Sequence, residues 1–290
     1  MSVSAFRPGA TGTGAIVAAL CLAAGAAVGA AQAEPDLAGC RRSFDENFSG
    51  RLSTWSPARP SGRWKTNYAF GRQGDWTSRN FPATGEKQLY VDAGLGVNPF
   101  KVSGGLLTIH AAPTPQALKP RLWNYAYVSG VLTTEKSFSM TYGYVEARME
   151  LPMGKGTWPA FWLIPTDLSW PPEIDVMEAV GKPEVRQTIH TRDAAGKPAD
   201  WGMTVPLRGG GMHRFGALWT PRSVTFFVDG RKTGETATPP DMHKPMYLVL
   251  NLGIGGTWPG DPDPAIFRGA NLRVDYVRAW RCPVAGGTVR

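Results

Sequence analysis

The sequence predicts an all-β protein, built as a two-sheet antiparallel sandwich of the jelly-roll type. The composition indicates this first, because Gly (35) and Pro (25) are frequent among the 290 residues and only 19% are charged. Such a composition is typical of short strands joined by tight turns. Several segments also alternate polar and apolar residues with the period of a strand. Helical periodicity is confined to the first residues, which leaves packed sheets as the consistent architecture.

The clearest predicted strand covers residues 142–151. Tyrosines and charged residues occupy one of its faces and small or apolar residues the other, which is typical of a half-buried antiparallel strand. The run 223–228 is followed by Asp229-Gly230, a dipeptide that favours a tight hairpin turn. Further β-rich runs lie at 106–109, 188–191, 246–252 and 272–280.

The N-terminal region has the pattern of a secretory signal. An apolar run of small residues, 15–31, leads into Ala31-Gln-Ala33, a typical cleavage site. We therefore expect residues 1–33 to be removed on export, which predicts a secreted protein. The alternative is an uncleaved anchor helix, which Gly25 and Gly29 disfavour. No linker or charge block interrupts residues 34–290, which we expect to form a single domain.

The mature chain is basic. The formal charge of the whole sequence is +8, and removal of Arg7 with the acid-free segment 1–33 leaves 8 − 1 = +7. A basic exported protein tends to meet acidic partners such as anionic polysaccharides. The sequence has no clustered Lys/Arg run, so we expect no nucleic-acid partner. A scattered, solvated surface charge explains the same balance equally well.

Two cysteines remain after the signal, near the two ends of the mature chain. A disulfide between Cys40 and Cys282 would join the first and last strands, and export permits it. A rival interpretation is that Leu37-Ala-Gly-Cys40 is the acylation site of a lipoprotein. Acidic Glu34 and Asp36 separate that site from the apolar run, which weakens the rival.

Three acids lie within one apolar strand, in Glu173-Ile-Asp-Val-Met-Glu178. Glu173 and Asp175 share a face, whereas Glu178 would point into the core of a regular strand. An unpaired carboxylate is costly to bury. The sequence therefore predicts a β-bulge between Asp175 and Glu178, which returns all three acids to one face.

A cluster of like charges gains nothing for folding, so it is a candidate functional site. Glycoside hydrolysis needs two carboxyl groups, one of which attacks while the other protonates the leaving oxygen. We therefore predict that Glu173 and Glu178 form the catalytic pair and that Asp175 helps to separate their pKa values. A calcium site is the alternative, but it would need more oxygen ligands than the segment offers. The four histidines show no metal-ligand spacing, so we predict no metal ligands.

Aromatic residues around the acids support a sugar-binding cleft. Trp158 and Trp170 precede the acids, and Trp258 lies in a second Gly-Thr-Trp-Pro sequence. Aromatic faces stack on the apolar faces of sugar rings. We predict that these three residues and His190 contact the substrate, although a lone histidine on a strand is as often structural.

The chain resembles family 16 of the glycoside hydrolases, which includes laminarinases, lichenases, agarases and carrageenases. The matching motifs occur in the family's order over most of the mature chain: Tyr127-Val-Ser-Gly130, Tyr142-Gly-Tyr-Val-Glu-Ala-Arg148, Trp158-Pro-Ala-Phe-Trp162, Glu173-Ile-Asp-Val-Met-Glu178, Phe226-Phe-Val-Asp-Gly230, Gly255-Gly-Thr-Trp-Pro-Gly260 and Val274-Asp-Tyr-Val277. The run Ser169-Trp-Pro-Pro-Glu173 is similar to bacterial glycanases that trim acidic exopolysaccharides.

The resemblance implies a concanavalin-like jelly roll with an open cleft across one concave sheet. By the match, Glu173 is the nucleophile, Glu178 the general acid/base and Asp175 an assisting residue, while Trp170 flanks the cleaved sugar and His190 lies nearby. The implied reaction is retaining, endo-acting hydrolysis of a β-linked polysaccharide. It requires no cofactor, nucleic acid or membrane. Independently of the resemblance, we expect a monomer. A transglycosylase, or a non-catalytic sugar-binding module, remains an alternative on the same fold.

The sequence also departs from the family pattern. Val131 stands where many relatives have Arg, which leaves substrate contacts there open. Asn47 stands where many have a Glu that binds calcium together with the Asp matched by Asp275. The resemblance therefore leaves a structural calcium ion undecided.

Overall fold

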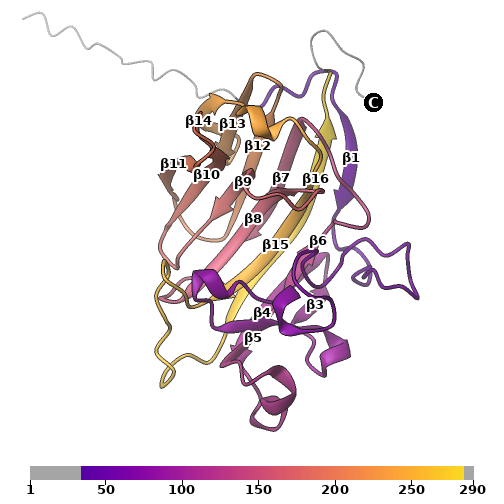
Figure 1. Cartoon of the computed structure of the whole chain (residues 1–290), viewed down its shortest axis with the longest axis vertical. Helices are drawn as coiled ribbons and strands as arrows, with labels where there is room; N and C mark the ends of the chain where they lie inside the picture. The colour runs from indigo at the N-terminus through magenta and orange to yellow at the C-terminus, as the bar shows by residue number, and fades with distance from the viewer. Residues whose placement is uncertain (1–33, 284–290) are drawn as a thin grey trace, which may run out of the picture. The chain divides into compact units, whose positions relative to one another are not determined.

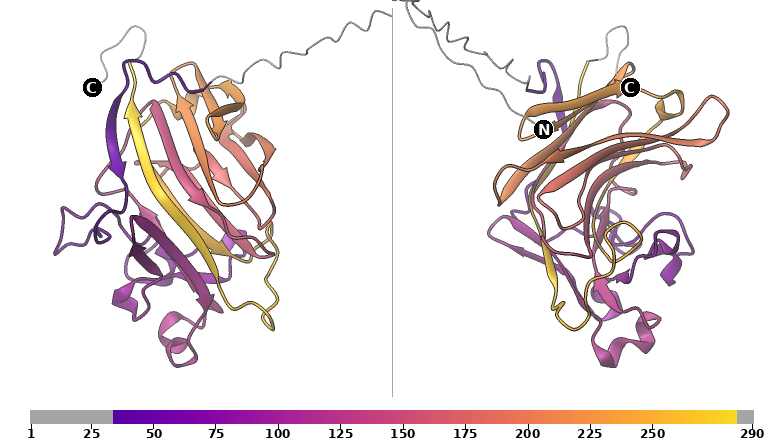
Figure 2. Two further views of the ribbon diagram at one scale, coloured as in Figure 1. Left: turned by 180° about the vertical axis from the view of Figure 1, so that it is seen from behind. Right: turned by 90° about the vertical axis from the view of Figure 1, so that its left-hand side faces the viewer.

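A computed structural model describes residues 34–283, and two β-sheets face each other within it (Figures 1 and 2). The predicted signal, residues 1–33, lies outside the described residues. The larger sheet has the order β14-β13-β12-β7-β16-β4-β5-β2, with β1 beside β16 and β3 beside β4. Its strands are β1 (Arg41–Glu46), β2 (Gln88–Tyr90), β3 (Phe100–Ser103), β4 (Leu106–Pro113), β5 (Tyr127–Ser129), β7 (Gly143–Glu150), β12 (Met212–Trp219), β13 (Ser223–Val228), β14 (Arg231–Ala237) and β16 (Ala270–Arg281).

The smaller sheet follows the order β11-β10-β9-β8-β15-β6. Its strands are β6 (Val131–Thr133), β8 (Thr157–Pro165), β9 (Glu173–Glu178), β10 (Glu184–Arg192), β11 (Pro198–Pro206) and β15 (Met246–Ile254). Short 3₁₀ turns complete the chain: η1 (Trp76–Ser78), η2 (Pro82–Thr84), η3 (Ala93–Leu95), η4 (Gln116–Leu118), η5 (Pro120–Leu122) and η6 (Pro240–Met242). None of the helices in this part of the chain is long and apolar enough to cross a membrane.

The predicted antiparallel sandwich is confirmed, with one exception in its pairing. β2 runs parallel to β5, while the other strand pairs are antiparallel. The predicted hairpin turn at Asp229-Gly230 also forms, between β13 and β14. Both of its residues have positive φ angles, 52° and 77°. This is the conformation that a two-residue turn of the I′ type requires.

The core lies between the two sheets. Val145, Ala147 and Met149 of β7 are at most 3% exposed and belong to the same buried cluster as Ile174 and Val176 of β9. The apolar face of each strand therefore packs against the other sheet, as the alternation predicts. The opposite face of β9 is left free to carry polar groups.

The outer face of β7 is more buried than its sequence predicts. Tyr144 and Glu146 are only 1% and 6% exposed. The Glu146 carboxylate accepts hydrogen bonds from Tyr144 Oη at 2.8 Å and Tyr276 Oη at 2.7 Å. The Tyr144 ring also packs against Trp280, with 5.4 Å between ring centroids. Neighbouring strands thus cover a face that the alternation alone assigns to solvent.

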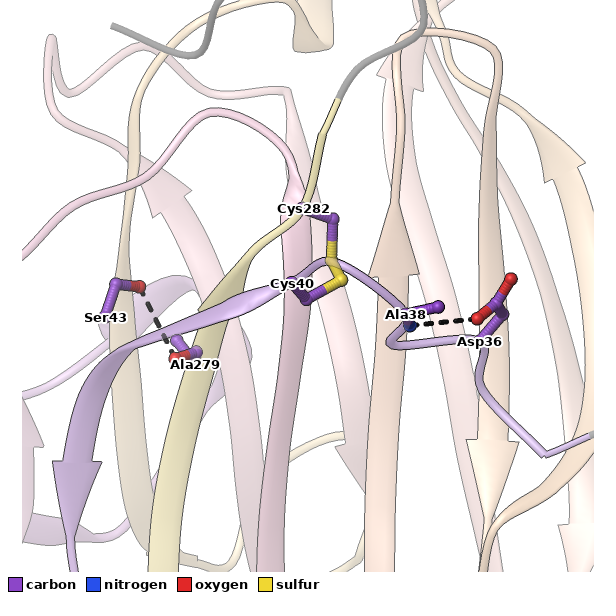
Figure 3. Close-up of a disulfide and its surroundings, with 6 residues drawn as sticks. All are labelled: Asp36, Ala38, Cys40, Ser43, Ala279 and Cys282. Carbon is purple, nitrogen blue, oxygen red and sulfur yellow. Dashed lines mark hydrogen bonds between the residues drawn. A yellow bond between two sulfur atoms is a disulfide. The ribbon is translucent and has the colours of Figure 1, made fainter.

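The two ends of the described chain are joined covalently. Cys40 precedes β1 and Cys282 follows β16, and a disulfide links them across a sequence separation of 242 residues (Figure 3). β1 pairs with β16 in register next to this bond. The arrangement agrees with the predicted cross-link. It leaves Cys40 without a free thiol for the alternative acylation.

Candidate active site

The bulge predicted in β9 is present, and it orders the site. On β8, Phe161 and Trp162 are adjacent, but their partners on β9 are Met177 and Asp175, so Val176 is the extra residue. The register with β10 shifts at the same place. A bulge restores the alternation beyond it. Glu178 consequently faces the same side of the sheet as Glu173 and Asp175.

A cleft of about 840 Å³ lies over this face of the smaller sheet. Every predicted site residue lines it: Glu173, Asp175, Glu178, Trp158, Trp170, His190 and Trp258. They come from β8, β9 and β10, the loop before β9 and the loop after β15. Residues separated by about a hundred positions in the chain are thereby brought together.

The Glu173 carboxylate is held by an exposed tryptophan. Trp170 lies in the loop between β8 and β9, and its Nε1–H donates to Glu173 Oε2 at 3.0 Å. The Trp170 side chain is 51% exposed. Its backbone carbonyl accepts a hydrogen bond from Arg192 Nη2 at 2.9 Å, at the end of β10. The loop therefore presents an aromatic face to solvent while its indole fixes one acid.

The Glu178 carboxylate is held by a tryptophan of the sheet itself. Trp158 Nε1–H, near the start of β8, donates to Glu178 Oε1 at 2.9 Å. The Trp158 ring contacts the Trp258 ring edge to face, with centroids 5.6 Å apart. Trp258 is 43% exposed. This pair forms an aromatic wall beside the second glutamate.

Asp175 lies between the two glutamates and is almost completely buried. Its side chain is 2% exposed, and His190 Nε2 lies 3.2 Å from its Oδ2. Oxygen and nitrogen atoms of Glu173, Asp175 and His190 lie within 4.8 Å of one another. The histidine therefore flanks the acids, as the sequence predicts.

Burial raises the pKa of all three acids. For Glu173 and Asp175 it is the largest cause, and the next is a neighbouring carboxylate, Asp175 in the first case and Glu178 in the second. For Glu178 burial also raises the pKa, and the Trp158 hydrogen bond offsets part of that increase. Ionisation of one of these neighbouring carboxyl groups therefore makes ionisation of the others less favourable.

The two residues that bear on a structural calcium ion, Asn47 and Asp275, each have another contact in this structure. Asp275 is paired with the Arg148 guanidinium. The side-chain oxygen of Asn47 accepts a hydrogen bond from its neighbour Ser49 N at 3.1 Å. Calcium needs six to eight oxygen ligands. Beyond these two side chains, the ligands of a calcium ion would have to come from backbone carbonyls or water.

Sequence reasoning missed a group of residues that lines the same cleft. Tyr68, Phe70 and Phe81 form an aromatic cluster at one side, with Tyr68 and Phe70 stacked at 4.5 Å between centroids. Glu86 and Asn251 line the cleft as well. Most of these residues come from the irregular segment between β1 and β2, which has no periodicity to indicate a face. The frequency of aromatic residues there was the only available signal.

Comparison with known proteins gives a consistent result. Residues 101–278 match the model of a family described as glycosyl hydrolases family 16. The chain is similar to ExsH, an endo-1,3-1,4-beta-glycanase of Rhizobium meliloti (strain 1021), with 39% identity over 204 residues, covering 68% of this chain and 44% of that protein. It is also similar to EglC, an endo-1,3-1,4-beta-glycanase of the same strain, with 42% identity over 185 residues, covering 63% of this chain and 40% of that protein.

Among solved structures, the X-ray structure of the laminarinase from Rhodothermus marinus is similar to this one. Its TM-score is 0.67 at 28% sequence identity, over 83% of this chain and 97% of that chain. The likeness supports the sandwich fold over most of the chain. The chain spans less than half the length of the two Rhizobium proteins.

Proposed function

The chain belongs to the glycosyl hydrolases of family 16, and on that premise we propose that it is an endo-acting β-glycanase that retains anomeric configuration. One observation carries the proposal. The bulge in β9 brings Glu173 and Glu178 into one cleft, where each carboxylate accepts a hydrogen bond from a different indole. Glycoside hydrolysis requires two positioned carboxyl groups of this kind.

In the first step, Glu173 attacks the anomeric carbon of the sugar. The bond from that carbon to the glycosidic oxygen breaks, and Glu178 gives its proton to the departing oxygen. In the second step, Glu178 takes a proton from water, and the water oxygen displaces Glu173 from the same carbon. The two displacements together retain the configuration. Neither step needs a cofactor or a metal.

The surroundings of the acids support this division of roles. The raised pKa of Glu178 favours a protonated acid at the start of the reaction. Glu173 accepts a hydrogen bond from Trp170, which stabilises its charged form. Asp175 is the more deeply buried partner of Glu173. Because Asp175 is hydrogen-bonded to Glu173 and lies beside it, we assign Asp175 an assisting role in the attack.

The substrate is proposed to be a polysaccharide bound along the aromatic walls of the cleft. Trp158, Trp170 and Trp258 offer ring faces for sugars, and His190 flanks the cleaved residue. The names of ExsH and EglC favour a glycan with β-1,3 and β-1,4 linkages, and we propose a β-1,3- or β-1,3-1,4-glucan. The charge of the mature chain also makes a related acidic exopolysaccharide a candidate. We propose that the chain acts outside the cell as a monomer, after removal of residues 1–33.

The test is release of reducing ends from laminarin, barley β-glucan, succinoglycan, agarose and carrageenan by residues 34–290. We expect rapid loss of polymer length on at least one substrate, and no release by Glu173→Gln. Both proteins should have the same circular dichroism spectrum and melting temperature. Affinity without turnover in the unmodified protein would indicate a sugar-binding module instead. Longer oligosaccharides among the products would indicate transglycosylation.

A further inference from the structure

A fourth carboxylate, Glu86, lines the cleft close to Glu178 and takes no part in the mechanism above. It lies between η2 and β2, in a segment that packs against the loop carrying Trp258, since Thr257 N donates to Thr84 O at 2.9 Å. The backbone is pinned from the other side, because Lys87 N donates to Ile254 O at 2.7 Å. Glu86 therefore has a fixed position beside the proposed acid/base.

Two chains of hydrogen bonds converge on Glu86, and their direction is determined. Trp162 Nε1 can only donate, so Asn251 accepts it through Oδ1 at 2.8 Å and turns its amide group toward Tyr90 Oη, 2.9 Å away. The Tyr90 hydroxyl accepts that bond and is left to donate to Glu86 Oε2 at 3.3 Å. The floor of the cleft thus directs a proton donor at this carboxylate.

The second chain ends on the same oxygen. Ile254 N donates to Gln88 Oε1 at 2.7 Å, which leaves the Gln88 amide group to donate to Glu86 Oε2. Oε2 consequently accepts two hydrogen bonds, which is its capacity. Both donors come from side chains whose orientation is fixed by other contacts.

The other oxygen, Oε1, is poorly satisfied. Its nearest donor is the Thr84 hydroxyl at 3.1 Å, but that hydroxyl also lies 2.8 Å from Phe81 O. One hydroxyl proton can serve only one of these acceptors. Among residues 34–283, no cation pairs with Glu86, and the neighbouring Lys87 pairs with Asp261 at 3.6 Å. Oε1 therefore has at least one unused acceptor position in the cleft, even when the Thr84 hydroxyl donates to it.

Nothing in the fold requires a charge at this place. Burial and, to a smaller extent, the proximity of Glu178 raise the pKa of Glu86 to about 7, although its hydrogen bonds act in the opposite direction. Ionisation of Glu86 therefore destabilises the fold. A neutral amide of the same size would fill the same space. Glu86 Oε1 thus has an acceptor position without a donor and is held rigidly in the cleft. This is typical of a group that binds a hydrogen-bond donor of the substrate.

We propose that Glu86 is a specificity-determining residue, whose Oε1 accepts a hydrogen bond from a sugar hydroxyl next to the bond cleaved at Glu178. The proposal rests on the proposed glycanase function. A site built to accept a hydroxyl hydrogen bond rejects ligands that lack it, because the acceptor is then left unpaired. Glu86 thereby discriminates among sugar units by hydroxyl orientation rather than by ring stacking.

The test compares Glu86→Gln with Glu150→Gln, a matched change on the opposite sheet, where the carboxylate pairs with Arg273 at 3.0 Å. Steady-state kinetics on barley β-glucan and laminarin would be measured for both variants and the unmodified protein. We expect Glu86→Gln to lose roughly tenfold to a hundredfold in kcat/KM, mostly through KM, as for a hydrogen bond to a charged group. Glu150→Gln should stay within twofold.

A second measurement separates binding from chemistry. Affinity for a mixed-linkage β-glucan tetrasaccharide would be measured by calorimetry in the inactive Glu173→Gln background, with and without Glu86→Gln. A matching loss of affinity supports the inference. Equal affinity, or unchanged kinetics in Glu86→Gln while the unmodified protein is active, overturns it. If the unmodified protein cleaves neither glucan, the same comparison is made on whichever of the other three polymers it cleaves. Lack of turnover on all five polymers would overturn the proposed function itself, and with it this inference.

Discussion

The two glutamates of the cleft accept the same hydrogen bond from differently supported tryptophans. Trp158 belongs to β8, where it pairs with Gly253 of β15 and packs against Trp258. Trp170 lies in a loop and is 51% exposed. It is held by hydrogen bonds with Glu173 and Arg192 and lies near the His190 ring. The indole-to-oxygen distances are nearly equal, 2.9 and 3.0 Å. Geometry alone therefore does not distinguish the two ends of the site.

The two tryptophans differ in the role that each can have besides donating a hydrogen bond to a glutamate. A residue inside a sheet is held by its neighbours on both sides, so Trp158 fixes the acid/base with little freedom to move. A loop residue with an open face can also meet the substrate. We infer that the Glu178 end of the site is set by the sheet. The Glu173 end is completed by a residue that contacts sugar.

The largest effects should come from the glutamates themselves, and the leaving group should separate their roles. Glu178→Gln should lower kcat on a β-glucan by about 10²–10⁴ through loss of general acid–base catalysis, and Glu173→Gln by at least as much. From a dinitrophenyl β-glycoside, the dinitrophenolate group departs without being protonated. On this substrate Glu178→Gln should recover its first step, seen as a burst of dinitrophenol, whereas Glu173→Gln should not. A burst from Glu173→Gln would reverse the assignment.

Intermediate effects should come from replacing each indole by a phenyl ring. Trp158→Phe removes a donor that favours ionised Glu178, so the pKa of Glu178 should rise and the alkaline limb of kcat/KM should move to higher pH. Trp170→Phe should lower kcat/KM by roughly tenfold without moving that limb, since the limb reports the acid. Identical pH profiles for the two variants would contradict the comparison.

The free energy of unfolding should also distinguish the two variants, and here Trp158→Phe should have the larger effect. Trp158 packs within the sheet, so Trp158→Phe should reduce the free energy of unfolding by about 1–2 kcal/mol. Trp170 is exposed, and Trp170→Phe should stay within about 0.5 kcal/mol of the unmodified protein. Urea denaturation followed by tryptophan fluorescence gives both values.

The sequence was informative where one rule decided the outcome. The odd spacing between Asp175 and Glu178 predicted the bulge, because a regular strand would have buried an unpaired acid. The alternation in 142–151 predicted β7 to within one residue at its start and one at its end. These inferences use only local geometry, which a single strand carries in its own residues.

The sequence did not predict features that depend on strands far apart in the chain. Glu146 is buried because Tyr276, on β16, covers it, and no pattern within β7 indicates that. Glu86 stands in an irregular segment, and its proximity to Glu178 exists only after the cleft forms. The parallel pairing of β2 with β5 also depends on how the intervening chain returns. Long-range packing sets all three features.

The smallest effect on catalysis should come from a change outside the cleft. The disulfide between Cys40 and Cys282 closes a loop of most of the described chain, and neither residue lines the cleft. Paired Cys40→Ser and Cys282→Ser changes should reduce the free energy of unfolding by about 2–5 kcal/mol, because the unfolded chain gains freedom. They should leave kcat and KM on β-glucan unchanged at temperatures well below the melting point. If kcat fell while the fold remained intact, the cleft would depend on the joined ends, and the contrast between sheet-held and loop-held tryptophans would not account for the site.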